Sequence, residues 1–167
     1  DSQLACWEGL QQGVLSLFSS DHAPFRWGGT VGKQPGGKRT SFRWVPNGIP
    51  GIETRLPILF SEGVSKGRIA LRDFVALTAT NHARHYGLTT KGSLAPGMDA
   101  DIVIWDPTVE RTIRQSDLHH GADYTPYEGL EVKGWPVATF LRGRPIVAAG
   151  QLVDEGRRGR FISRPAA

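Results

Sequence analysis

The chain of 167 residues contains a single cysteine, Cys6, and no apolar stretch that approaches the roughly 20 residues of a membrane-spanning helix. One thiol excludes a disulfide within the chain and a zinc site built from its cysteines alone. No basic region followed by an apolar stretch opens the sequence, as a signal peptide would require. We therefore expect a soluble, cytoplasmic protein with no membrane partner.

The length excludes a complete eight-stranded α/β barrel, which needs roughly 250 residues. A composition of 39% hydrophobic and 22% charged residues is typical of a globular domain. The net charge of +4 raises the question of nucleic acid, but the cations are scattered and no strand mixes aromatic with basic residues. A solvated surface is the simpler interpretation. A basic binding module that uses residues 26–46 stays open, and salt-dependent retention on nucleic acid would test it.

The first elements along the chain predict an α/β unit. Leu4–Gln12 has apolar residues at helical spacing and ends before Gly13. Val14–Ser20 is a mostly apolar run of strand length, which favours a strand buried on both faces. Asp21 and His22 follow this predicted strand directly. The C-terminal tip of such a strand is where α/β folds place their chemistry, so Asp21 is a candidate functional residue.

Residues 26–46 are rich in glycine and cations and have no sustained period, which predicts a long surface loop. Gly32–Arg39 within it resembles a phosphate-binding loop. The match is poor because Arg39 stands where that motif has Ser or Thr, and no buried strand directly precedes it.

Two helices and then a β-rich region are predicted further along. Glu53–Ser65 and Leu71–Tyr86 carry apolar stripes at helical spacing, suited to packing on a sheet. From Gly87 onward the sequence pattern changes to short β-rich runs separated by Gly, Pro and Asp. These runs are 101–105, 132–133, 137–141 and 145–148. The last two runs, joined by Arg142–Pro145, predict a hairpin. We place a boundary near residue 87.

Five sequence blocks, in order, resemble the cyclic amidohydrolases, most closely the dihydropyrimidinase and hydantoinase family. They are Ser20–Phe25 (SDHAPF), Asn47–Pro57 (NGIPGIETRLP), Ser61–Val64 (SEGV), Ala95–Pro107 (APGMDADIVIWDP) and Asp123–Gly129 (DYTPYEG). Dihydroorotases and allantoinases share some of these blocks and stay open as alternatives. The Asn-Gly-x-Pro-Gly loop together with the Asp-Tyr-x-Pro-Tyr-Glu-Gly block favours dihydropyrimidinase or hydantoinase.

The resemblance implies an α/β fold class: the terminal portion of a metal-dependent amidohydrolase (β/α)8 TIM barrel plus part of a small β-sandwich domain. Residues 1–86 would hold the last strand and helices of the barrel, and residues 87–167 the β-sandwich segment and tail. The activity implied is opening of the cyclic amide ring of hydantoins or dihydropyrimidines, with two divalent metal ions, expected to be zinc, as cofactors. Asp21 matches the family's metal ligand that also moves the catalytic proton. Asn47 matches the position whose main chain contacts the cyclic amide.

The remaining metal ligands of the family are not matched in this chain. The family has a His-x-His pair, a carbamylated lysine and two further histidines, whereas the five histidines here, His22, His82, His85, His119 and His120, have other settings. We interpret His22 as a packing or supporting residue, His82 and His85 as a surface or helix-end pair, and His119 and His120 as structural. These residues alone are therefore expected to lack hydrolase activity. A non-catalytic relative of the dihydropyrimidinases that serves protein assembly is the other reading, although Asp21 argues against it.

The resemblance also implies a homotetramer in which the C-terminal tail contacts a neighbouring subunit. Gly159–Ile162 followed by Arg164 and Pro165 has the aromatic and arginine content of an interface anchor. A small cyclic amide is the expected partner, and nucleic acid is not.

Overall fold

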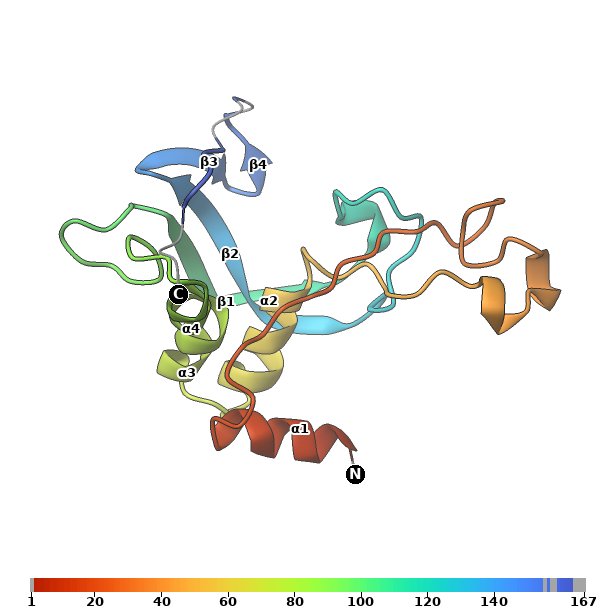
Figure 1. Ribbon diagram of the computed structural model, residues 1–167, viewed down its shortest axis with the longest axis horizontal. Coiled ribbons are helices and arrows are strands. Elements are labelled where there is room, and N and C mark those ends of the chain that lie inside the picture. Colours follow the sequence, from red (N-terminus) through yellow and green to blue (C-terminus); the bar gives the residue numbers. More distant parts are fainter. Residues whose placement is uncertain (1, 155, 157–158, 164–167) are drawn as a thin grey trace.

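The computed structural model describes residues 2–154, 156 and 159–163, in which helices pack against one antiparallel sheet (Figure 1). Helix α1 spans Ser2–Gln11, α2 Arg55–Leu59, α3 Leu71–Val75 and α4 Asn81–Tyr86. Strand β1 spans Ile102–Thr112, β2 Glu131–Leu141, β3 Arg144–Ala148 and β4 Gln151–Leu152. Short 3₁₀ turns occupy Gly37–Arg39, Phe42–Trp44 and Gln115–Asp117. No helix among these residues is long and apolar enough to cross a membrane.

The two predicted helical regions are confirmed, each with a change of winding. Helix α2 continues as a π-helical segment over Phe60–Ser65, and α3 is joined to α4 by a π-helical segment over Ala76–Thr80. Gly87 ends α4 in the left-handed conformation, with φ of 68°. The N–H of Leu88 then bonds the carbonyl of Ala83 at 2.8 Å, which satisfies a carbonyl at the helix end.

The sheet has the strand order β1-β2-β3-β4, and all its pairings are antiparallel. The predicted hairpin is confirmed as β2 and β3. Arg142 and Gly143 connect them at φ of 47° and 78°, the two positive values that a tight hairpin turn requires. Strand β1 extends past the predicted run 101–105. Its register shifts between Asp106 and Glu110, beside Pro107, which cannot donate to the ladder.

An aromatic cluster joins the helices to the sheet. The rings of Phe60, Phe74 and Trp105 lie 4.9 to 5.5 Å apart, and Trp105 comes from β1. The buried side chains of Leu59, Ile69 and Leu77 complete this core. The helices therefore share one core with the sheet, and the boundary near residue 87 stays a prediction.

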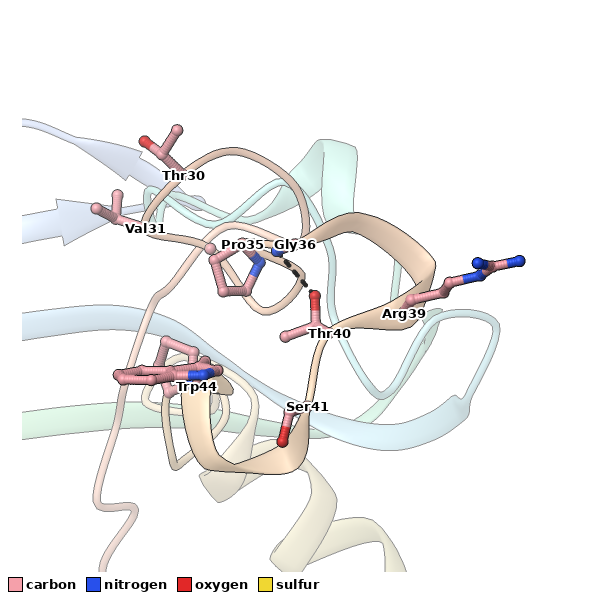
Figure 2. Close-up of a pocket in the computed structure, with 10 residues that line it drawn as sticks. Thr30, Val31, Pro35, Gly36, Arg39, Thr40, Ser41 and Trp44 are labelled. Carbon is pink, nitrogen blue, oxygen red and sulfur yellow. Dashed lines mark hydrogen bonds between the residues drawn. The ribbon is translucent and has the colours of Figure 1, made fainter.

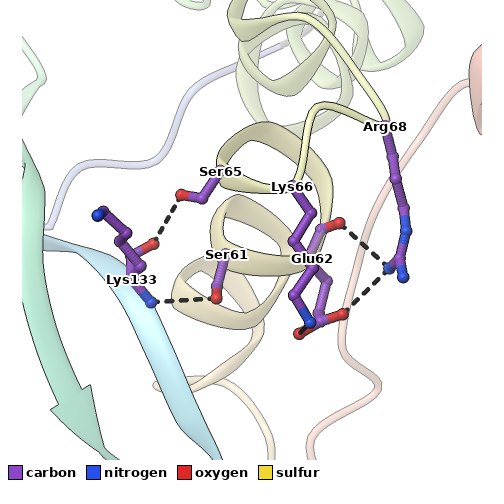
Figure 3. A network of polar contacts seen from close by, with 6 residues as sticks. All are labelled: Ser61, Glu62, Ser65, Lys66, Arg68 and Lys133. Carbon is purple, nitrogen blue, oxygen red and sulfur yellow. Dashed lines mark hydrogen bonds and ion pairs between the residues drawn. The ribbon is translucent and has the colours of Figure 1, made fainter.

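Polar contacts hold the π-helical segment of α2 on strand β2 (Figure 3). The Lys133 N–H donates to Ser61 Oγ at 3.0 Å, and Ser65 Oγ donates to the Lys133 carbonyl at 3.0 Å. On another side of the same helical turn, Glu62 pairs with Lys66 at 2.6 Å and with Arg68 at 3.0 Å. The hydrogen bond from Lys66 is the main reason that the pKa of Glu62 lies below its ordinary value. Helix α2 is thereby held in one orientation on the sheet.

The predicted strand at Val14–Ser20 was wrong. Residues 16–20 have no regular secondary structure, and Val14 and Leu15 are 75% and 43% exposed. Helical residues supply the partners instead: the Phe18 N–H donates to the Leu77 carbonyl at 3.0 Å, and Asn81 Nδ2 donates to the Ser16 carbonyl at 2.8 Å. A parallel strand needs neighbouring strands, and the described residues place none beside this segment.

The predicted surface loop is confirmed and sets the outline of the molecule. Residues 26–46 extend away from the helices and run close to the segment that connects β1 to β2 (Figure 1). Their secondary structure consists of the two 3₁₀ turns at Gly37–Arg39 and Phe42–Trp44. Phe42 and Trp44 are 91% and 67% exposed. This loop therefore contributes little to the hydrophobic core.

Gly134 in β2 gives a test of how the helices meet the sheet. Its φ is +96°, and a Cβ added there would lie 2.2 Å from a ring carbon of Phe60. We expect Gly134→Ala to lower the free energy of unfolding by about 3 kcal/mol, from overpacking added to backbone strain. Gly129→Ala is the control because its φ of +80° carries the same strain in open space. Chemical denaturation of both variants measures the difference, and equal losses would contradict this packing.

A second test uses the ion cluster that ties the segment before β1 to the hairpin. Lys91 Nζ pairs with Asp99 at 3.0 Å and also with Asp101, which accepts the Arg142 N–H at 2.8 Å. The hydrogen bond that Lys91 donates to Asp99 lowers the pKa of Asp99, and the one that it donates to Asp101 raises the pKa of Lys91. Burial raises the pKa of Asp101, but its bonds to Lys91 and Arg142 outweigh this and lower it.

The stabilisation from this cluster has a defined pH window. Since the aspartate pKa values lie below 3.8 in the folded state, their contribution is complete above pH 3.8 and is lost as the pH falls through the folded values. Since the pKa of Lys91 lies above 10.5, its contribution is complete below that pH and is lost above it. We expect the stability difference between wild type and Lys91→Met to be constant between these limits and to shrink outside them. Unfolding curves at stepped pH measure it, and a difference independent of pH would count against the cluster.

Candidate functional site

Side chains of helices α2 and α4 bind the segment that precedes Asp21. Arg55 Nη1 donates to the Phe18 carbonyl at 2.7 Å, and His82 Nε2 lies 3.1 Å from the same oxygen. Burial lowers the pKa of Arg55 below its ordinary value. The backbone leading to Asp21 is therefore fixed by side chains of α2 and α4.

Asp21 stands in a strained turn with its carboxylate exposed. Its φ is 44°, in the left-handed region that aspartate tolerates better than most residues with a Cβ. Among the residues that the structure describes, none forms a hydrogen bond or ion pair with its carboxylate. The sequence prediction of a carboxylate at a chemically accessible position is consistent with this geometry, although the preceding segment is not a strand.

The Asn47 loop packs directly on the Asp21 turn. The Ala23 N–H donates to the Ile49 carbonyl at 3.0 Å. Gly48 has φ of +80°, and a Cβ there would lie 2.6 Å from the Ala23 methyl and 3.7 Å from the Asp21 carbonyl oxygen. Glycine is therefore needed at position 48 for two reasons: it adopts this φ without strain, and it has no side chain to collide with Ala23. The two sequence-predicted site residues, Asp21 and Asn47, are brought to adjacent loops.

His22 links these two loops as a supporting residue, as predicted. Its Nδ1 accepts the N–H groups of Gly51 at 3.0 Å and Ile52 at 3.2 Å. Its ring centroid lies 6.0 Å from that of His120 in an edge-on arrangement. An Nδ1 that accepts two N–H groups carries no proton, and its lone pair is engaged by the backbone.

His82, His85 and His119 have structural settings of their own. His82 bonds the Phe18 carbonyl and stacks on Tyr86, while His85 is exposed. His119 pairs with Glu53, its N–H and Nδ1 lying 2.8 and 2.9 Å from the two carboxylate oxygens. Throughout residues 2–154, 156 and 159–163, no three His, Cys, Asp or Glu side chains are grouped as a metal site would require.

A third segment, Asp123–Tyr127, completes the cluster of loops. The Trp27 N–H donates to Asp123 Oδ1 at 2.7 Å, and the Trp27 and Tyr124 rings lie 5.2 Å apart. Tyr127 lies beside Gly51, where an added Cβ would be 3.9 Å from its ring. Sequence reasoning identified the Asp123 block only by resemblance and missed Trp27, because nothing in the local pattern links residues 96 positions apart.

Lys33 and Arg55 were also missed as residues that shape this region. Lys33 Nζ donates to the carbonyls of Pro46 and Gly48, on either side of Asn47. Cations in a polar loop are ordinarily solvated, so the sequence carried no signal for this contact.

A cavity of about 570 Å³ lies within the long loop (Figure 2). Thr30, Pro35, Thr40 and Trp44 are among the residues that line it, whereas Asp21 and Asn47 are not. Arg39 also lines it, with the end of its side chain extending outward (Figure 2). The resemblance of Gly32–Arg39 to a phosphate-binding loop gains no support, because Arg39 stands where that motif has Ser or Thr.

Comparison with known proteins places this geometry in a family. Residues 2–146 match the amidohydrolase family. D-hydantoinase from Ralstonia pickettii is 45% identical over 159 residues, 95% of this chain and 34% of that protein. D-phenylhydantoinase from Escherichia coli O1:K1 is 41% identical over the same shares.

A solved structure agrees with these relatives. A D-hydantoinase superimposes with a TM-score of 0.87 at 42% identity, over 96% of this chain and 34% of that one. The chain thus spans about a third of the length of the curated relatives it matches. The expected fold class is confirmed as part of the amidohydrolase α/β barrel fold together with a small sheet. The hydantoinases are among the proteins that it resembles, and the chain belongs to the amidohydrolase family.

Proposed function

We propose that the protein is a metal-dependent hydrolase that opens the cyclic amide ring of hydantoins or dihydropyrimidines, and that these residues supply one part of its active site. The observation that carries the proposal is the packing of the Asp21 turn on the Asn47 loop, where Ala23 bonds Ile49 and leaves no room for a side chain at Gly48. The names of the relatives, D-hydantoinase and D-phenylhydantoinase, indicate the substrate class.

Asp21 is the residue of this chain that fits a divalent metal ion. Its carboxylate is exposed and engages no other described residue, and carboxylate oxygen is a ligand for such ions. A bound ion would polarise the ring carbonyl and lower the pKa of coordinated water. Because the described residues contain no group of three ligating side chains, further ligands must come from elsewhere in the protein. We propose that the complete site binds two metal ions and that both are zinc.

The roles of the two site residues follow from their chemistry. Asp21 accepts the proton of the attacking water and passes it to the ring nitrogen that leaves, so one carboxylate acts as base and then as acid. The Asn47 main chain binds the cyclic amide, whose N–H and C=O complement a backbone carbonyl and amide. The left-handed turn at Asp21 and the positive φ of Gly48 keep both groups at the surface of one loop pair.

We further propose that the protein is a cytoplasmic homotetramer. The tail supports this interface: Phe161 is 95% exposed and Ile162 is 42% exposed, although both are apolar. Arg164 and Pro165, the rest of the predicted anchor, lie outside the described residues.

The role of Asp21 is tested by the substitution Asp21→Asn in the complete, metal-loaded protein. Asparagine keeps the size of the side chain and tolerates the same φ, but cannot hold the transferred proton. We expect kcat/KM for hydantoin to fall about 10³-fold or more. Asp117→Asn, at an exposed aspartate outside the loop cluster, is the control and should retain activity. An Asp21→Asn variant with more than a tenth of wild-type kcat/KM would remove Asp21 from the mechanism.

The packing of the two loops is tested by Gly48→Ala, with Gly29→Ala as the matched control. Both glycines have positive φ, at +80° and +90°, but an added Cβ meets Ala23 at 2.6 Å only in the first. We expect Gly48→Ala to lower kcat/KM about 10²-fold by displacing Asn47 from Asp21. Gly29→Ala should keep wild-type activity, because nothing lies within 4 Å of its added Cβ. Equal activity of the two variants would show that the loop contact does not matter for hydrolysis.

A further inference from the structure

Backbone hydrogen bonds within the long loop fix the position of Lys33. The Lys33 N–H donates to the Arg26 carbonyl at 2.8 Å, and the Gln34 N–H donates to the Trp27 carbonyl at 3.0 Å. Trp27 is in turn anchored to Asp123 and Tyr124. These bonds close a small loop over residues 26–34 and dock it on the segment between β1 and β2. The backbone of Lys33 is therefore placed by tertiary contacts even though the loop is long.

From this backbone position the Lys33 side chain reaches the Asn47 loop. Its ammonium donates to the Pro46 and Gly48 carbonyls and lies 5.6 Å from the centre of the Phe25 ring, beside the Asp21 turn. Lys33 is half-buried, whereas Lys38 in the same loop is exposed. An ammonium has three donors and no acceptor, so two carbonyls can converge on it without competing.

The contact determines how Asn47 is presented. With the Pro46 and Gly48 carbonyls bound to one cation, the 46–47 and 48–49 peptide groups that bracket Asn47 are restrained. Asn47 itself forms no hydrogen bond with any other residue in the described part of the chain. The restraint therefore leaves the Asn47 N–H and carbonyl available for an external cyclic amide.

We propose that Lys33 is a positioning residue that holds the Asn47 main chain in the conformation that binds the cyclic amide ring. This inference rests on the proposed function, since it assigns a role toward the same substrate. A restraint of this kind acts on the bound ring before and during reaction alike, so its loss weakens binding rather than the chemical step.

The test compares Lys33→Met with Lys33→Arg in the full metal-loaded protein, with Lys38→Met as the matched control. Methionine keeps an unbranched apolar stem and removes the ammonium, whereas arginine keeps donors that can reach two carbonyls. We expect Lys33→Met to raise KM for hydantoin about tenfold and to leave kcat within about twofold, since a charged hydrogen bond has been lost from a binding group. Lys33→Arg should recover most of the affinity, and Lys38→Met should match wild type.

A second measurement reports on the contact without substrate. Hydrogen exchange of the Ala23 and Gly51 backbone amides, which donate to the Ile49 carbonyl and to His22 Nδ1, should be about tenfold faster in Lys33→Met than in wild type or Lys38→Met. Unchanged exchange would overturn the restraint itself. Faster exchange with an unchanged KM, or with a loss confined to kcat, would overturn the role in ring binding. If the wild-type protein opens no cyclic amide, the proposed function fails and the ring-binding role fails with it, while the exchange rates still decide whether Lys33 restrains the loop.

Discussion

The close approach of Phe60 to the backbone of Gly134 is the contact on which the rest of the structure depends. Any side chain at Gly134 would occupy the position of the Phe60 ring, which in turn packs on Phe74 and Trp105. Because this cluster joins the helices to the sheet, it also fixes the elements to which two of the site's loops are attached. The Asn47 loop leads directly into helix α2, and the Asp123 segment connects β1 with β2.

The candidate site is built from loops whose positions are determined at their ends. The Asp21 turn is held from one side by the bond of Arg55 to Phe18 and from the other by the bond of Ala23 to Ile49. Chemistry on loops requires such anchoring, because an unrestrained loop would lose the alignment of a carboxylate and a substrate-binding backbone. Here the anchors are a side-chain bond to a carbonyl and a backbone bond between two loops, which restrain the chain without the regularity of a helix or a strand.

Local pattern was sufficient for the elements whose stabilising contacts lie close in the sequence. The helices over residues 55–65 and 71–86 and the β2–β3 hairpin were predicted because apolar spacing and turn residues act within a few positions. The strand predicted at Val14–Ser20 failed for a corresponding reason. A buried parallel strand depends on neighbours that are distant in sequence, and here Leu77 and Asn81 take the bonds that such neighbours would have supplied.

The sequence by itself therefore determined the helices, the hairpin, the long loop and, through its ordered blocks, the family to which the chain belongs. It also identified Asp21 and Asn47 as the residues to examine. Only the tertiary structure decided that their loops are in contact, that Trp27 binds Asp123 from 96 residues away, and that Lys33 bridges the carbonyls around Asn47. The physical reason is that a side chain's type and spacing specify its local conformation, whereas its partner across the molecule depends on how the packed core brings distant backbone together.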